Sequence, residues 1–232
     1  MMHKTVNAEQ IGQLYIFTQE HFVAYYDLQT ELADHLANAI ESLWQTRPLL
    51  TFDDALQIEF KKFGVYGFSD VVAERQKALG KRYMKLMARY FKDFFKLPRI
   101  ILTIALFVVT YKAFLFQPML YVPVILMLQG FSFYRIIKQK KKYKLKTEAT
   151  GKRWLLEELI YKGNTILGFS GITMQCIQFT FHDHLRPVYI GIMTIVFLLS
   201  LMHSYVVLYI IPAKAEEHLA AAYPGYKWEK LS

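Results

Sequence analysis

The chain has 232 residues, of which 54% are hydrophobic, and it carries a formal net charge of +9 with a single cysteine. This apolar content exceeds the roughly 45–50% that is usual for soluble domains. The lone Cys176 excludes an intramolecular disulfide and a zinc site built from cysteines. The first ten residues are polar, so we expect no cleaved signal peptide.

Apolar and charged residues are divided unevenly along the chain. Residues 1–96 mix apolar and charged positions, whereas 100–137 and 166–211 are nearly free of charge. We find no alternating strand pattern. The sequence therefore predicts an all-α protein in which an N-terminal cytosolic helical bundle, residues 1–96, precedes four transmembrane helices arranged in two hairpins.

Helix start and stop signals follow one another through residues 1–96. Cap residues precede apolar patterns of helical spacing, and proline or glycine follows them, which is typical of short packed helices. These signals are the capping pair of Asn7 and Gln10, the break at Arg47-Pro48 after a helix at about 27–45, the cap Thr51, the helix-ending Gly64, and Ser69 at the start of a basic fourth helix.

A polar stripe accompanies the apolar face of the second predicted helix. Glu31 and His35 are i,i+4 neighbours that can touch, and with Asn38 they lie along one edge of that face. Together they offer a metal two or three ligands, fewer than a tetrahedral or octahedral site needs. We therefore favour a helix-packing or partner-docking role over a metal or catalytic site. The candidate packing or docking residues, which we call the stripe, are Glu31, His35 and Asn38 together with Asp34, which lies further out toward solvent.

The same region resembles a known type of helical domain. Glu31, His35-Leu36 and Ile40-Glu41, followed by Phe52-Asp53-Asp54-Ala55 and Phe63-Gly64, resemble the HAAS-type domain of bacterial membrane proteins. Glu31-Leu32-Ala33-Asp34-His35 is also similar to an "ELxDH" signature of uncharacterised multi-pass membrane proteins of Bacteroidetes-type bacteria. The resemblance covers about residues 10–70. It implies a cytosolic helical module attached to membrane helices, often beside regulatory or transport proteins, and it implies no catalytic residue.

Four apolar segments make up the predicted membrane part. A bilayer core of about 30 Å requires about 20 helical residues. Only Gln117 and Pro118 separate the first two segments, so we expect one hairpin at 97–138 and a second at 164–212, followed by a cytosolic tail at 213–232. Two crossings with re-entrant segments are the alternative. The segments are 100–116, 119–137, about 164–181 and 188–211.

Basic residues flank the first predicted hairpin on both sides. By the positive-inside rule they place both termini in the cytoplasm, here of a bacterial inner membrane. Residues 139–163 are expected to form a basic cytosolic loop with a short amphipathic helix near Trp154 on the membrane surface. A lysine run beside a membrane helix favours anionic lipid headgroups over nucleic acid. The headgroup-binding candidates are Lys138, Lys140, Lys141, Lys142, Lys144 and Lys146.

Three polar residues fall inside the later apolar segments. His203 lies deep in the last segment, where an ionisable side chain is a functional candidate, although a packed neutral histidine is more common. Gln175 and Gln178 favour hydrogen bonds between membrane helices. His182-Asp183-His184 in the predicted outer turn is a weaker metal candidate, because turns favour such residues.

The sequence predicts a non-enzymatic accessory or regulatory membrane protein without a cofactor, acting through a protein partner or as a homo-oligomer. The alternatives are a small methyltransferase-like or metal-dependent membrane enzyme and an oligomeric channel or transport subunit. The stretches 185–191 and 215–226 are similar to motifs of membrane isoprenylcysteine and phospholipid methyltransferases. However, the histidine expected between Arg186 and Pro187 is missing, and one crossing would separate the two stretches.

Overall fold

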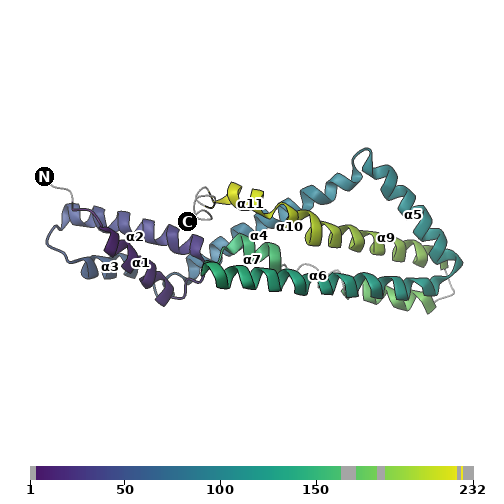
Figure 1. Ribbon diagram of the computed structural model, residues 1–232, viewed down its shortest axis with the longest axis horizontal. Helices are drawn as coiled ribbons and strands as arrows, with labels where there is room; N and C mark the ends of the chain where they lie inside the picture. Colours follow the sequence, from purple (N-terminus) through teal and green to yellow (C-terminus); the bar gives the residue numbers. More distant parts are fainter. Residues whose placement is uncertain (1–3, 163–170, 182–185, 224–225, 227–232) are drawn as a thin grey trace. The chain divides into compact units, whose positions relative to one another are not determined.

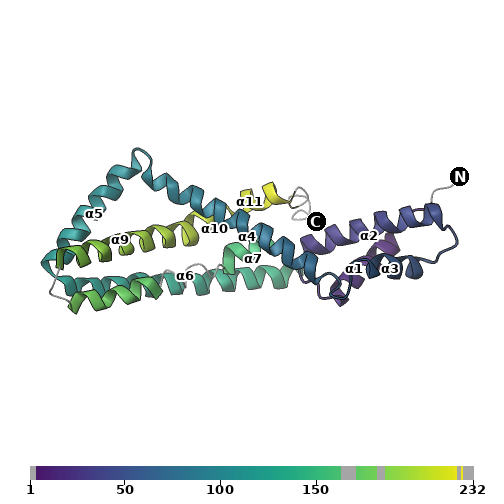
Figure 2. The ribbon, with the colours of Figure 1, turned by 180° about the vertical axis from the view of Figure 1, so that it is seen from behind.

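The computed structural model describes residues 4–162, 171–181, 186–223 and 226. Within these ranges every regular element is a helix, which confirms the all-α expectation (Figures 1 and 2). The chain forms two compact units. Unit 1 consists of residues 1–81 and 150–155, and unit 2 consists of residues 82–149 and 156–232.

Unit 1 is a small helical bundle whose predicted caps are present. The Asn7 side chain accepts a hydrogen bond from the Gln10 backbone N–H at 2.8 Å, and the Gln10 side chain accepts one from the Asn7 N–H at 3.0 Å. Thr51 Oγ1 accepts a hydrogen bond from the Asp54 N–H at 3.1 Å. The helices are α1 (Ala8–Glu20), α2 (Tyr26–Thr46), α3 (Phe52–Lys61) and the first half of α4 (Ser69–Lys92).

The apolar face of α2 forms the centre of the core of unit 1. Leu36 and Ile40 are fully buried, and Leu14 of α1 packs in the same cluster. Burying a side chain of this size contributes about 1.5–3 kcal/mol. The remaining buried members of this core are Val23, Leu28, Leu32, Ala33, Trp44, Ala55, Leu56, Phe68 and Leu155.

Residues 150–155 return from late in the chain to the start of α2. The Tyr26 N–H donates to the Arg153 carbonyl oxygen at 2.7 Å, and the Leu155 N–H donates to Asp27 Oδ1 at 3.1 Å. Trp154 is buried, with its ring 5.4 Å from that of Tyr26. Trp154 is therefore part of the packing of unit 1, rather than a membrane-surface residue as the sequence analysis expected.

Among the residues of unit 2 that the structure describes, three helices are long and apolar enough to cross a membrane. They are Arg99–Phe116, Pro118–Thr150 and Pro187–Ala213. In the third, 61% of the most apolar window is buried, against 6% in the first, so the third is the inner helix of the unit. The fourth predicted crossing, about 164–181, lies partly outside the described residues; within it, residues 171–175 are helical and η3 (Cys176–Phe181) follows.

Within residues 82–162 and again within 186–223, the elements of unit 2 follow one another with short connections. α5 packs along α9, and the η4 segment is a π-helix within the same continuous helix as α9. The described elements, besides the second half of α4 and η3, are η1 (Asp93–Phe95), α5 (Arg99–Phe116), η2 (Pro118–Leu120), α6 (Tyr121–Thr150), α7 (Leu155–Lys162), α9 (Arg186–Tyr205), η4 (Val206–Ile210), α10 (Ile211–Ala213) and α11 (Ala215–Ala222).

The structure differs from the expected loop at 139–163. α6 continues through the lysine run to Thr150, because lysine is a good helix former and neither glycine nor proline interrupts the run. The expected short amphipathic helix is present as α7, and its Leu156 and Ile160 are buried. The basic segment therefore extends α6 by about three turns beyond the predicted end of the membrane helix.

Candidate functional site

The predicted polar stripe of α2 lies beside the chain that follows α3. Glu31 forms an ion pair with Arg75 of α4, and both side chains are half exposed. The His35 ring meets Phe63 edge-on, with centroids 6.1 Å apart. Exposed ion pairs of this kind contribute about 1 kcal/mol or less. Glu31 and His35 therefore each contact a different neighbour of α2, rather than forming one site together.

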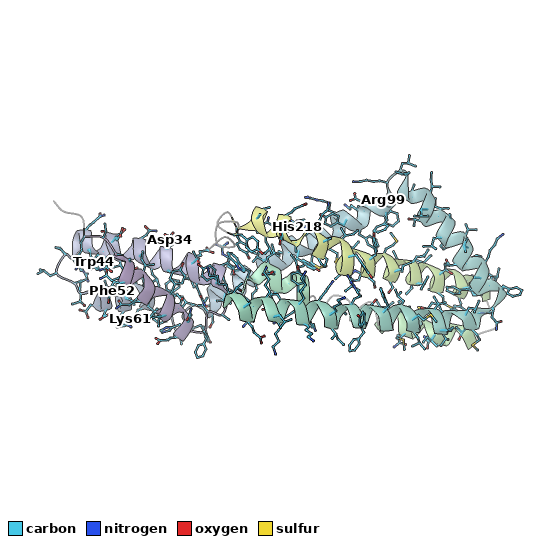
Figure 3. All side chains as sticks on the ribbon, in the orientation of Figure 1. Asp34, Trp44, Phe52, Lys61, Arg99 and His218 are labelled. Atoms are coloured by element: carbon cyan, nitrogen blue, oxygen red, sulfur yellow. The ribbon has the colours of Figure 1, made fainter. Side chains whose placement is uncertain are left out.

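The other two stripe residues stay on the surface of α2. Asn38 Nδ2 donates to the Asp34 carbonyl oxygen at 2.9 Å, a bond within one helix. Asp34 itself is exposed (Figure 3). Among the residues that the structure describes, no group of three or more His, Cys, Asp or Glu side chains is placed to hold a metal ion. The weaker metal candidate 182–184 lies outside the described residues.

The lysines of α6 fall into two groups. Lys138, Lys140, Lys141, Lys142 and Lys144 have exposed side chains. Lys146 is half-buried, forms an ion pair with Glu157 of α7, and donates to the Tyr226 hydroxyl at 3.0 Å. Its ammonium group therefore contacts protein atoms, unlike the exposed lysines, and the expectation that Lys146 binds a headgroup is wrong.

The polar residues of the apolar segments lie in different surroundings. His203 is buried in α9, while Gln175 and Gln178 are exposed. Thr173, which the sequence analysis did not single out, joins its segment to α6: its carbonyl oxygen accepts from the Tyr121 hydroxyl at 2.9 Å, and its Oγ1 accepts from Gln129 Nε2 at 2.8 Å. The structure therefore contains hydrogen bonds between helices of the kind expected for Gln175 and Gln178, but other residues form them. The sequence signal for these bonds was the polar amide of Gln129 within an apolar segment.

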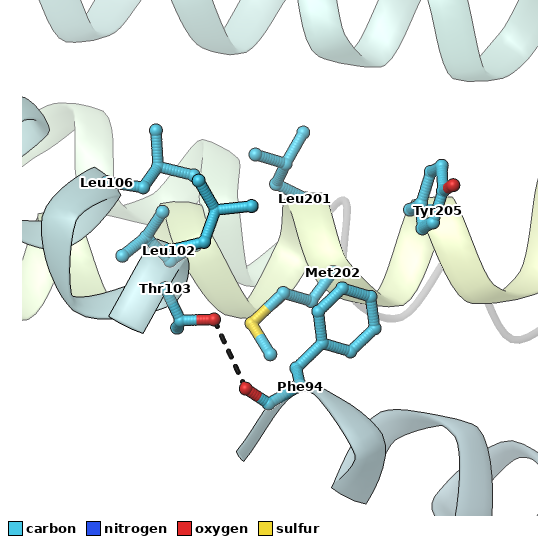
Figure 4. Close-up of a pocket in the computed structure, with 8 residues that line it drawn as sticks. Phe94, Leu102, Thr103, Leu106, Leu201, Met202 and Tyr205 are labelled. Carbon is cyan, nitrogen blue, oxygen red and sulfur yellow. Dashed lines mark hydrogen bonds between the residues drawn. The ribbon is translucent and has the colours of Figure 1, made fainter. Parts of the chain in front are cut away.

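Unit 2 contains a cavity that the sequence analysis missed. Its volume is about 240 Å³, it lies between η1, α5 and α9, and its lining is almost entirely apolar (Figure 4). Thr103 Oγ1 at its edge donates to the Phe94 carbonyl oxygen at 3.3 Å. We call this the apolar cavity. It is lined by Phe94, Leu102, Thr103, Leu106, Leu198, Leu201, Met202 and Tyr205.

A second, larger cavity adjoins the first and is more polar. Its volume is about 720 Å³, and it shares four lining residues with the apolar cavity. We call it the polar cavity. The two together form one amphipathic site, apolar at one end and charged at the other. The residues specific to the polar cavity are Tyr90, Asp93, Arg99, Tyr209, Ile210, Ala213 and Lys214.

The charge in the polar cavity is mainly positive. Asp93 is the carboxylate of its lining, and it accepts a hydrogen bond from Lys96 Nζ at 2.8 Å. This bond to Lys96, together with the charges of Arg99 and Lys214, keeps the pKa of Asp93 below its usual value. Lys96 already balances the ionised Asp93, so the charges of Arg99 and Lys214 remain to attract an anion.

A π-helical segment shapes this site. Pro212 has no N–H, so the Leu208 carbonyl four residues earlier lacks its usual α-helical donor. Gln139 Nε2 and an Arg135 guanidinium nitrogen of α6 supply hydrogen bonds to that oxygen, at 2.8 and 3.4 Å. π-helical segments of this kind often occur at functional sites. The sequence signal was Pro212 at the end of an apolar segment.

Tyrosines of the π-helical region line the polar cavity. Tyr205 and Tyr209 stack with their ring centroids 5.6 Å apart, and Arg135 lies 4.4 Å over the Tyr209 ring. Both tyrosines face the polar cavity, and Lys214 lies 5.4 Å over the ring of Tyr90. The arrangement gives a cation-rich site with an aromatic wall.

His218 of α11 lies beside this site, and its Nε2 is 3.2 Å from the Tyr90 hydroxyl (Figure 3). Burial lowers the pKa of His218 below its usual 6.5; the charges of Lys214, Arg82 and Arg89 also lower it, while Glu217 opposes them. We therefore expect the imidazole pKa of His218 to lie below 6.5 in the folded chain. An NMR titration of the protein with labelled histidine measures it. A pKa of 6.5 or higher would contradict the packing of α11 described above.

The same shift has a defined effect on stability. The unfolded chain binds the His218 proton more readily than the folded chain does. The contribution of neutral His218 to the free energy of unfolding is therefore fully present above pH 6.5, and it is lost as the pH falls through the pKa of His218 in the folded chain. A urea-unfolded sample supplies the reference titration.

The methyltransferase-like stretches are far apart in the structure. The continuous helix Pro187–Ala213 has 27 residues, and the described parts of the two stretches, 186–191 and 215–223, lie toward its opposite ends. At 1.5 Å per residue this helix is about 40 Å long. The two motifs therefore do not share one site.

Comparison of the chain with protein-family models, with curated proteins and with solved structures found no match. The HAAS-type resemblance therefore remains an expectation drawn from the short motifs alone.

Proposed function

We propose that the chain is a non-enzymatic accessory protein of a bacterial inner membrane, whose N-terminal helical unit binds a protein partner. Three apolar helices support the membrane assignment. The positive-inside rule favours cytoplasmic termini, and the five exposed lysines of α6 are proposed to contact anionic headgroups. The HAAS-type resemblance supports a regulatory role for the helical unit.

The observation that carries the partner-binding proposal is the conformation of Phe22. Its φ is +63°, in the left-handed region, and its side chain is 91% exposed, although its neighbour Val23 is buried. A non-glycine residue in this region costs about 1–2 kcal/mol. Strained residues with exposed side chains are candidates for functional sites. A large aromatic ring held outside the core at this cost is best explained by a binding partner.

A second exposed apolar group lies at the same end of unit 1. Val65 and Tyr66 follow α3, with side chains 98% and 73% exposed. The end of α1 meets this region directly, because the His21 ring packs 4.4 Å from that of Phe60 and 6.0 Å from that of Phe68. We call Phe22, Val65 and Tyr66 the apolar tip. It provides a small hydrophobic surface from two connections of the bundle.

The charges around the apolar tip favour a protein over a lipid surface. Membrane-anchoring surfaces are rich in lysine and arginine around their apolar residues. Here the nearby charges have mixed sign, with Glu20 before Phe22, Lys61 before Val65 and Asp70 after Tyr66. An apolar centre with a mixed polar rim is typical of protein interfaces. The stripe Glu31, Asp34, His35 and Asn38 is proposed to extend this docking surface along α2.

The test replaces Phe22 with glycine in the full-length protein. Glycine adopts positive φ without strain, so the substitution removes about 1 kcal/mol of backbone strain from the folded state. Glycine also raises the conformational entropy of the unfolded chain, and the two effects nearly cancel. We expect the stability of unit 1 to change by less than about 1 kcal/mol, while binding of co-purifying protein is lost. Affinity purification in mild detergent with quantitative mass spectrometry, beside thermal unfolding, measures both.

Leu49→Ser is the matched control for Phe22→Gly. Leu49 is 98% exposed in the connection between α2 and α3, the opposite end of α2 from Phe22. This variant should retain the partner. Equal loss of the partner from both variants, or full retention by Phe22→Gly, would show that the apolar tip is not the binding surface.

A further inference from the structure

The two adjoining cavities of unit 2 lie where two candidate membrane helices end. Arg99 is the first residue of α5, and Lys214 directly follows α10. Both residues line the polar cavity. Because they lie at the ends of apolar helices, these cations lie at the level of lipid phosphates if the helices cross a bilayer. This step rests on the membrane crossing included in the proposed function.

The apolar cavity extends from that level along the apolar helices. Leu102 and Leu106 lie one and two turns into α5, and Met202 lies in the last turns of α9. At 1.5 Å per residue, Leu106 is about 10 Å from Arg99 along the helix axis. The lining therefore changes from cationic to apolar within about 10 Å, a little more than the roughly 5–8 Å thickness of one headgroup layer.

The aromatic wall matches the same boundary. Tyrosines are enriched at membrane interfaces, where the ring lies in apolar surroundings and the hydroxyl reaches polar groups. Tyr90, Tyr205 and Tyr209 line the polar cavity, and Tyr205 also borders the apolar cavity. Basic pockets between transmembrane helices are known to bind anionic lipid headgroups.

We propose that the two cavities hold one anionic phospholipid, with its phosphate between Arg99 and Lys214 and the start of one acyl chain in the apolar cavity. This is a specific, stoichiometric site, separate from the general attraction of headgroups to the exposed lysines of α6. The bound lipid joins the start of α5 to the end of the α9 helix, so it stabilises the packing of these two helices.

The test measures lipid binding to delipidated full-length protein in detergent. Dioleoylphosphatidylglycerol is titrated, and native mass spectrometry counts the lipids bound. We expect a first phosphatidylglycerol to bind at least about tenfold more tightly than phosphatidylcholine. Replacing both cations, Arg99→Gln with Lys214→Gln, should weaken the first binding step about tenfold or more, because two charge contacts are lost.

Matched controls separate the site from bulk attraction. Lys77→Gln with Lys81→Gln removes the same charge from exposed positions of α4 that have no proposed role in lipid binding, and it should change the first binding step by less than about twofold. Equal weakening by both pairs would overturn the proposal in favour of general electrostatics. Equal binding of phosphatidylcholine to the original protein would overturn it as well.

A third variant tests the apolar cavity without removing charge. Leu102 is exposed at the rim, where tryptophan is tolerated at a membrane interface, so Leu102→Trp should fold and should still weaken the first lipid. Circular dichroism checks folding.

Full displacement of the lipid by soluble glycerol phosphate would show an anion site instead of a lipid site. A dimer that is lost with Arg99→Gln and Lys214→Gln would place a second copy there and overturn the lipid assignment.

These outcomes are independent of the partner-binding test. Phe22→Gly should leave the first lipid-binding step unchanged, because Phe22 belongs to unit 1 and the cavities belong to unit 2. Loss of lipid binding in Phe22→Gly would contradict the assignment of the lipid to the cavities.

Discussion

Replacing Lys146 with methionine is expected to destabilise unit 2 by about 3 kcal/mol. The reason is its partner Glu157, whose side chain is only 4% exposed and whose carboxylate pairs with the Lys146 ammonium. Removing one partner of a buried pair leaves the other charge without compensation in a poorly solvated site, which costs about 3–5 kcal/mol. Lys146 is partly exposed, so we expect the lower end of this range.

Hydrogen exchange of the α7 amides in detergent measures this effect, because it reports the free energy of local opening. Lys144→Met is the control, since the Lys144–Glu148 pair on the same helix is 3.7 Å apart and exposed on both sides. An exposed pair of this kind is worth about 0.5 kcal/mol. If both variants accelerated α7 exchange equally, Glu157 would not depend on Lys146.

A double variant separates the pair from simple packing. Lys146→Met combined with Glu157→Gln removes both charges, so it should cost at least about 1 kcal/mol less than Lys146→Met alone. The same result would explain why Lys146 has a different role from the exposed lysines around it. Lys146 holds α7 against α6 through Glu157, whereas the exposed lysines are proposed to contact the membrane surface.

Local features of unit 1 were predictable from the sequence. The caps at Asn7 and Thr51 depend on residues three positions away, and both are present in the structure. The apolar face of α2 depends on a repeat within a single helix, and Leu36 and Ile40 of that face are buried. Such signals lie within one turn to a few turns of helix, so sequence spacing is enough to find them.

Features that join distant segments were not predictable in the same way. The burial of Trp154 depends on Tyr26, and the state of Lys146 depends on Glu157 and Tyr226. A basic run by itself shows only its charge, so all its lysines were assigned the same role. The sequence predicts that the second membrane helix ends near residue 138, whereas α6 continues to Thr150. The change from apolar to charged residues marks the end of a membrane span, but it does not mark the end of a helix.

The amphipathic site was missed for a related reason. It combines residues near Arg99 with residues near Lys214, which are more than one hundred positions apart in the chain. Each cation alone is an ordinary flank of an apolar segment. The packing of α5 against α9 and the π-helical segment together bring the two cations to one cavity. Of these two features, only the π-helical segment has a sequence signal, which is Pro212.

Leu36→Ala is expected to destabilise unit 1 by about 3–4 kcal/mol, whereas His35→Ala next to it should cost about 0.5–1 kcal/mol. Leu36 is fully buried in the core, so its truncation leaves a cavity among closely packed side chains. His35 is exposed and loses only the edge contact with Phe63. Chemical unfolding of the full-length protein, followed by tryptophan fluorescence to which Trp44 of this core contributes, measures both values.

This contrast also decides how the stripe of α2 can be tested. If His35→Ala costs less than about 1 kcal/mol, unit 1 stays folded, and any larger loss of partner binding reports contact with the partner rather than unfolding. If His35→Ala destabilises unit 1 as strongly as Leu36→Ala, the stripe belongs to the core, and its docking role must be abandoned. The apolar tip at Phe22 would then be the remaining candidate surface for a partner.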